Sequence, residues 1–153
     1  MKVKAADVMV PIDEYPVVAE DDYINKAAAV LVQKYGNRDS TWQGYESLIV
    51  TNKFNQRIGI LSLRAILKAI EKNRPARRVK NLFVKKRKKD AGIPVKNLMR
   101  PLNTGFVDVN DDARQAVRLM MENRVNSVPV CHGNNPVGII RAIDLFWFIE
   151  EML

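Results

Sequence analysis

The stretch Val8-Met9-Val10-Pro11 near the start of the chain returns as Leu98-Met99-Arg100-Pro101, and the residues that follow it repeat as well. Each copy continues with a short apolar run, an acidic pair, and a stripe of apolar residues at the helical spacings of three and four. Two further apolar runs and a closing helical segment complete each copy. A unit written twice predicts a pseudo-twofold molecule, with its site between the copies or duplicated across them.

The two copies keep one register except at a single loop. Val17 and Phe106 are 89 residues apart, whereas Ser47 and Ser127 are 80 residues apart. The first copy therefore has about nine extra residues between Val32 and Ser47, in a polar, turn-forming stretch. Growth of a surface loop leaves the core of a repeat intact.

Each copy predicts the order strand, helix, strand, strand, helix. The last two runs are short, rich in Val and Ile and apolar throughout, which predicts strands covered on both faces. Hairpin loops are expected at residues 52–56 and 132–135. An acidic pair is expected to cap the first helix of each copy. These pairs are Asp21-Asp22 and Asp111-Asp112.

We expect a first repeat at residues 1–73, a basic connector at 74–94 and a second repeat at 95–153. One repeat of roughly 60 residues would be marginally stable by itself. Two copies are therefore expected to share a core, and the predicted fold class is α/β (α+β).

The formal net charge of +8 comes from the connector. Between Lys72 and Lys89 the chain has ten basic residues and no acidic one, so the two copies are near neutral. The segment is interpreted as a solvated linker, as a site for nucleic-acid phosphates, or as a positive rim for the phosphates of a bound nucleotide.

The remaining signals exclude several classes of function. No apolar run approaches the ~20 residues of a membrane span, so no membrane insertion is expected. The single cysteine, Cys131, excludes an internal disulfide and favours a cytoplasmic location. It adjoins the single histidine, His132, which fits neither a zinc site nor a catalytic triad. No phosphate-binding glycine loop occurs, and no enzyme activity is expected.

The ordered set of motifs, present twice from about Ala5 to Ile149, resembles a tandem pair of cystathionine β-synthase (CBS) domains, known as a Bateman module. The resemblance implies two β-α-β-β-α repeats packed about a pseudo-twofold axis. It also implies clefts between the sheets that take adenosyl ligands such as AMP, ADP, ATP or S-adenosylmethionine.

The ligand motif of that family resembles Gly-x-x-(Ser/Thr)-x-x-Asp, in which the hydroxyl serves phosphate and the aspartate holds the ribose diol. The first copy keeps the hydroxyl as Ser62 but has Ala65 in place of the aspartate. It should therefore hold a ribose poorly, and Ser62 is also interpreted as a helix cap.

The second copy has the opposite pattern. It keeps the glycine of the motif as Gly138 and the aspartate as Asp144, but Arg141 replaces the hydroxyl residue. In the family, the glycine allows the ligand to approach the backbone. An arginine fork suits phosphate, so this copy is the predicted ligand site. Simple helix-start and surface roles remain open for Asp144 and Arg141. The resemblance adds residues lining an adenine pocket, for which strand and core roles also remain open. These are Thr104, Gly105, Phe106, Val128 and Pro129.

We therefore predict a stand-alone regulatory module that binds an adenosyl ligand and signals to an effector protein. The apolar run at residues 145–149, which includes Trp147, predicts a homodimer interface. The alternatives are a ligand-free assembly module and nucleic-acid binding through the connector.

Overall fold

The computed structural model of the chain describes residues 2–35, 45–72 and 92–153. They divide into two compact units, Tyr15–Pro101 and Met1–Glu14 together with Leu102–Leu153. Most of the extra loop of the first copy and most of the basic connector, residues 36–44 and 73–91, lie outside the described residues.

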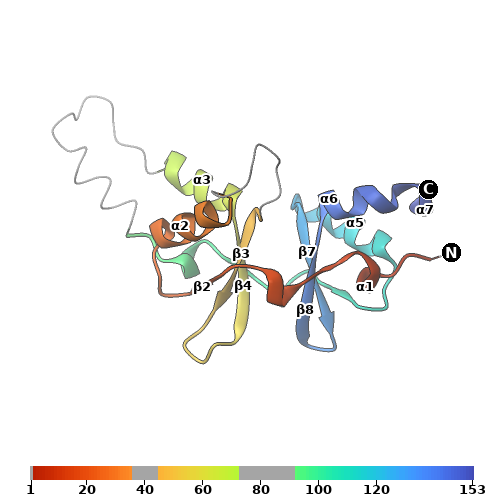
Figure 1. The fold of residues 1–153 in the computed structure, drawn as a ribbon, viewed down its shortest axis with the longest axis horizontal. Helices are drawn as coiled ribbons and strands as arrows, with labels where there is room; N and C mark the ends of the chain where they lie inside the picture. Colours follow the sequence, from red (N-terminus) through yellow and green to blue (C-terminus); the bar gives the residue numbers. More distant parts are fainter. Residues whose placement is uncertain (1, 36–44, 73–91) are drawn as a thin grey trace. The chain divides into compact units, whose positions relative to one another are not determined.

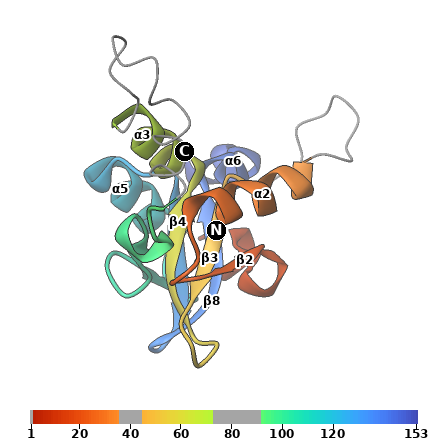
Figure 2. The ribbon, with the colours of Figure 1, turned by 90° about the vertical axis from the view of Figure 1, so that its left-hand side faces the viewer.

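The unit Tyr15–Pro101 is a four-stranded sheet with helices (Figures 1 and 2). Its strands lie in the order β2-β3-β4-β5, and only the β2–β3 pair is parallel. The turn of the β3–β4 hairpin points away from α2 and α3 (Figure 2). The elements are β2 (Val17–Ala19), α2 (Ile24–Tyr35), β3 (Ser47–Thr51), β4 (Arg57–Ser62), α3 (Leu63–Lys72), η3 (Val95–Asn97) and β5 (Arg100–Pro101).

The second unit repeats this architecture. Its strands lie in the order β1-β8-β7-β6, and only the β6–β7 pair is parallel. The elements are α1 (Ala5–Val8), β1 (Val10–Pro11), η1 (Ile12–Glu14), β6 (Val107–Asp108), α5 (Ala113–Asn123), β7 (Ser127–His132), β8 (Asn135–Arg141), α6 (Ala142–Leu145), η4 (Phe146–Phe148) and α7 (Ile149–Met152).

The predicted order of elements is confirmed in both copies, as β2-α2-β3-β4-α3 and β6-α5-β7-β8-α6. Both hairpin loops are where the sequence predicted them. Asn52 accepts hydrogen bonds from the backbone N–H groups of Phe54 and Gln56, and Gly133 turns the β7–β8 hairpin with a positive φ of 63°. The mixed α/β (α+β) class with two β-α-β-β-α repeats is therefore correct.

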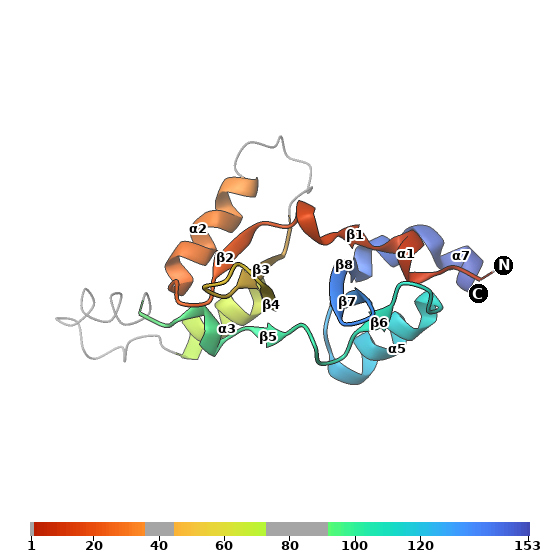
Figure 3. The same cartoon turned by 90° about the horizontal axis from the view of Figure 1, so that it is seen from below.

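The edge strands are exchanged between the copies, which the sequence did not reveal. The Met-x-Pro stretch of the first copy forms β1 and pairs with β8, with Val10 opposite Ile139. The corresponding stretch of the second copy forms β5 and pairs with β4, with Arg100 opposite Ile60. Figure 3 shows β1 beside β8 and β5 beside β4. The compact units therefore do not coincide with contiguous halves of the chain.

The two hydrophobic cores use equivalent residues, which supports the repeat at the level of packing. Both cores contain a residue from the exchanged segment, Val95 in one unit and Ala5 in the other. The other equivalent pairs are Val18 and Val107, Ala27 and Ala116, Leu31 and Met120, Leu48 and Val128, Val50 and Val130, Leu61 and Ile140, and Ile66 and Leu145.

The predicted helix caps are correct in one copy only. Asp112 caps α5 by accepting a 3.0 Å hydrogen bond from the backbone N–H of Arg114. In the first copy Tyr23 directly precedes α2, and the Asp22 carboxylate instead accepts from the backbone N–H of Ala19 at 3.1 Å. Asp111 makes the bond equivalent to that of Asp22, because its carboxylate accepts from the backbone N–H of Asp108. One aspartate therefore closes a turn in each copy, and a second aspartate caps a helix in the second copy alone.

Gly59 and Gly138 are required by the exchanged strands. A Cβ placed on Gly138 would stand 2.9 Å from Cγ and 3.0 Å from Cβ of Met9, and a Cβ on Gly59 would stand 2.6 Å from Sδ of Met99. Real Cβ atoms do not approach neighbours so closely, so each glycine accommodates the methionine of the Met-x-Pro stretch.

We expect Gly138→Ala to lower the free energy of unfolding by ~1–3 kcal/mol, because the new methyl group overpacks the space filled by Met9. Urea denaturation measures the loss. The double variant Gly138→Ala with Met9→Ala should lose less than the sum of the two single variants, because removing the methionine makes room for the methyl. Strict additivity would show that the two side chains do not compete for space.

Candidate functional site

The strongest polar arrangement in the second unit lies where β8 ends and α6 begins. The Asp144 carboxylate accepts three hydrogen bonds from Arg141. Nε donates to Oδ2 at 2.7 Å, Nη2 donates to Oδ1 at 2.6 Å, and the backbone N–H donates to Oδ2 at 3.2 Å. The side-chain pair is a bidentate fork, the strongest common form of an ion pair.

The fork joins the two residues that the sequence assigned to separate parts of a ligand. The Asp144 side chain is 16% exposed and that of Arg141 is 28% exposed, so both groups are partly withdrawn from solvent. Their opposite charges, three residues apart at a helix start, were the sequence signal for an ion pair. Sequence reasoning missed this pair because it assigned Asp144 to the ribose and Arg141 to the phosphate of a ligand.

The first copy builds the same helix start with different chemistry. The Ser62 hydroxyl oxygen accepts a 3.0 Å hydrogen bond from the backbone N–H of Ala65, so Ser62 caps α3. A complete capping box has two hydrogen bonds. The hydroxyl of the N-cap residue accepts from the backbone N–H three residues later, and the carboxylate of that later residue accepts from the backbone N–H of the N-cap residue. Copy one keeps the first half as Ser62, and copy two keeps the second half as Asp144.

Strand pairing gathers the other predicted ligand residues of the second unit along β7. Arg141 lies opposite Ser127, the neighbour of Val128. Val107 lies opposite Val130, so Phe106, which precedes it, comes to the same stretch of β7. The Phe106 side chain is 39% exposed. Among the predicted lining residues, all of which the structure describes, it alone is large, hydrophobic and exposed.

The remaining predicted residues differ in their surroundings. Val128 belongs to the hydrophobic core, and Pro129 is fully buried opposite Ile139. Thr104 and Gly105 are exposed before β6, where Gly105 has a positive φ of 72°. The space above Gly138 is filled by Met9, which gives this glycine a packing role.

Burial perturbs two groups outside the fork. Burial lowers the pKa of the Arg100 guanidinium on β5. Burial, followed by the charge of Asp108, raises the pKa of the Cys131 thiol, which therefore stays protonated near neutral pH. A 2.9 Å hydrogen bond from Nζ to Asp21 raises the pKa of the exposed Lys96.

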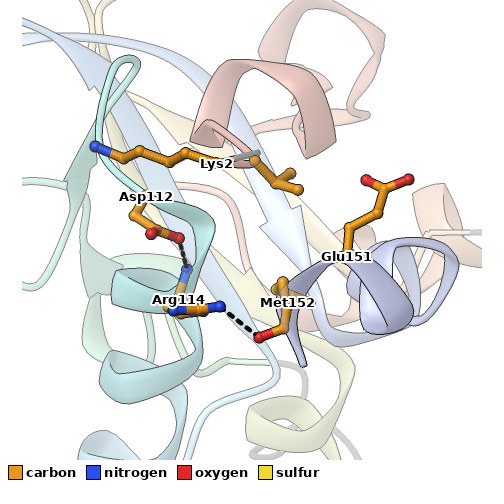
Figure 4. Close-up of a pocket in the computed structure, with 6 residues that line it drawn as sticks. Lys2, Asp112, Arg114, Glu151 and Met152 are labelled. Atoms are coloured by element: carbon orange, nitrogen blue, oxygen red, sulfur yellow. Dashed lines mark hydrogen bonds between the residues drawn. The ribbon is translucent and has the colours of Figure 1, made fainter.

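A pocket of about 260 Å³ lies elsewhere in the second unit and shares no residue with the predicted ligand set (Figure 4). Arg114 lines it, and its Nη2 donates a 2.6 Å hydrogen bond to the backbone oxygen of Met152. The lining residues are Lys2, Val3, Asp112, Arg114, Glu151 and Met152.

Residues 2–35, 45–72 and 92–153 contain no cluster of three or more His, Cys, Asp or Glu side chains that could hold a metal ion. Among the helices of the same ranges, none has the length and apolar character to cross a membrane.

Comparison with known proteins identifies the repeat. A family model described as CBS domain matches residues 5–72 and 95–151. No curated protein sequence matches the chain. The matched ranges are the two copies recognised from the Met-x-Pro stretches, and between them they cover most of the chain.

Several solved structures share the fold. CBSX2 in complex with AMP is 21% identical, with a TM-score of 0.68 over 97% of each chain. CBSX2 from Arabidopsis thaliana is 20% identical, with a TM-score of 0.68 over 99% of this chain and 97% of the other. A conserved CBS domain protein of unknown function from Thermoplasma acidophilum is 17% identical, with a TM-score of 0.72 over 97% of this chain and 70% of the other.

These structures agree with the family match on the fold. Two matched copies, equivalent cores and paired Met-x-Pro strands together show that the chain belongs to the CBS domain family, as a tandem CBS pair.

Proposed function

We propose that this chain is a cytoplasmic regulatory module that binds one adenosyl ligand on its second copy and signals to a partner protein. The observation that carries the proposal is the partly buried Asp144 carboxylate at the start of α6, which can accept two hydrogen bonds from a ribose diol. The complex of CBSX2 with AMP supports an adenosyl ligand for this fold.

The site is suited to signalling because its helix continues into an exposed apolar surface. We call Ile143, Phe146, Trp147 and Ile149 the terminal patch; Trp147 is 80% exposed and Phe146 is 65% exposed. Asp144 lies within the same short helical run as these residues. A ligand that displaces the contacts of Asp144 would shift the population of conformations at the terminal patch, where a partner reads the change.

A regulatory role also agrees with the chemistry of the described residues. The fork of Arg141 and Asp144 pairs two charged groups that could each contact a ligand, the guanidinium a phosphate and the carboxylate a ribose diol. CBS pairs generally serve as regulatory and not as catalytic modules, and we propose no reaction for this chain.

We expect calorimetry with AMP to give about one ligand per chain, because only the second copy keeps the aspartate of the repeated motif. Asp144→Ala should weaken binding by ~1–3 kcal/mol through the loss of hydrogen bonds to a charged acceptor. Asp144→Asn, which keeps the shape of the side chain, should weaken it for the same reason.

The converse substitution is the matched control. Ala65→Asp places the missing aspartate three residues after Ser62, and should create a weak second site on the first copy. Wild-type affinity in Asp144→Ala, confirmed as folded by its thermal transition, would remove Asp144 from the ligand site.

We further propose that the module is a homodimer through the terminal patch. Leu145 is buried against its own unit, whereas its neighbours Phe146 and Trp147 are exposed. The run 145–149 is therefore covered on one side by the described part of the chain and presents large aromatic side chains on the other. Exposed aromatic clusters are typical anchors of protein interfaces.

We expect light scattering to show a dimer at micromolar concentration, and Trp147→Glu to dissociate it, because a charge at an interface anchor costs ~2 kcal/mol or more. Phe54→Glu is the control, since Phe54 is 72% exposed in the β3–β4 loop of the other unit. A wild-type monomer, or dissociation by Phe54→Glu and Trp147→Glu alike, would contradict the assignment of this interface.

A second candidate function is a ligand-free assembly module. The observation that favours it is the fork itself, because Asp144 already has strong donors without any ligand. In that case the protein would dimerise through the terminal patch and bind none of the adenosyl compounds.

A further inference from the structure

We propose that Arg141 acts as a latch on Asp144 that selects adenosine 5′-phosphates over adenosyl compounds without a phosphate. The inference rests on the proposed adenosyl site and specifies its ligand class and its regulation. The latch is the pair of side-chain bonds, Nε to Oδ2 and Nη2 to Oδ1, that closes the carboxylate in the free protein.

The latch is separable from the structural role of Asp144. Capping at the start of α6 requires only the bond from the backbone N–H of Arg141 to Oδ2. The first copy begins its last helix with Ser62 and Ala65, which carry no charge, so this turn of the fold does not need an ion pair. The guanidinium fork is therefore an addition specific to the second copy.

A nucleoside without phosphate meets a closed site. Its diol competes for the two carboxylate oxygens that the guanidinium occupies. It supplies donors for Asp144 but offers Arg141 no charged acceptor in exchange for the carboxylate. Separating a partly buried ion pair without replacing one of its partners is costly.

A nucleotide satisfies both groups at once. Its phosphate accepts the two parallel hydrogen bonds of the guanidinium, which fits phosphate as well as carboxylate. Arg141 can then exchange the Asp144 carboxylate for the phosphate of the ligand. The ribose diol donates its hydrogen bonds to the carboxylate that Arg141 has released. S-adenosylmethionine has a sulfonium in place of the 5′-phosphate, and its carboxylate lies further away at the end of the methionine chain. The sulfonium therefore places a positive charge near the released guanidinium, so this compound is disfavoured.

The test is calorimetry of wild type and Arg141→Gln with AMP, adenosine and S-adenosylmethionine. Wild type should bind AMP at least about tenfold more tightly than either other compound, the effect of one good charged hydrogen-bonded pair. Arg141→Gln should bind adenosine several-fold more tightly than wild type does and AMP about tenfold less tightly, so that the preference disappears.

Arg118→Gln is the matched control, because Arg118 is an exposed arginine on α5 of the same unit. It should leave all affinities unchanged. Arg141→Lys keeps the charge but not the fork, and should retain only part of the preference for AMP. Arg141→Lys also replaces Arg141→Gln as the test variant if Arg141→Gln does not unfold in a cooperative thermal transition.

The outcomes separate the latch from the site. An AMP-to-adenosine ratio that is the same in wild type and both Arg141 variants overturns the latch and leaves the adenosyl site standing. Tighter binding of S-adenosylmethionine than of AMP by wild type also overturns the latch. Binding of adenosine by Arg141→Gln together with no binding of AMP by the wild type also overturns the latch, because the wild type would then select no phosphate. Absence of binding by every form rejects the proposed function, and the latch with it.

Discussion

The pairing of two very short strands with the opposite copy is the constraint on which both units depend. Val10 of β1 lies opposite Ile139, and Arg100 of β5 lies opposite Ile60. Each strand completes a sheet edge, and the methionine before each strand fills the space above a glycine of its partner strand. A bare edge would leave backbone groups without partners. Each copy therefore depends on a segment that precedes the other copy in the chain.

The same few residues serve the fold and the candidate site. The family motif at the end of the last strand is also a capping box split between the copies, with its hydroxyl half in Ser62 and its carboxylate half in Asp144. Loss of either half from one copy leaves the helix start intact, because one capping bond remains. This explains how the two copies can differ in ligand chemistry without differing in backbone architecture.

Sequence reasoning succeeded where it used periodic patterns, because both cores follow the register set by residues such as Val18 and Val107. It missed the strand exchange, because a two-residue strand has no periodicity and its partner is distant in the chain. It also expected Asp21 or Asp22 to cap α2, whereas the Asp22 carboxylate accepts a hydrogen bond from the backbone N–H of Ala19 and closes a local turn. The motif selected Arg141 and Asp144 as candidate site residues, and their opposite charges three residues apart were a signal for a pair. The bidentate geometry of that pair comes from the structure and not from the motif.

The strand exchange has a consequence for synthesis of the chain. Val10 leaves the ribosome 129 residues before its partner Ile139. Contacts between such distant residues form slowly, because a long loop must close before they gain any stability. The sheet containing β1 is therefore finished only after β8 has emerged, whereas β4 and β5 can pair earlier. Until β8 has emerged, β1 has no partner strand in its own chain, and segments left unpaired in this way can pair with another copy of the same chain.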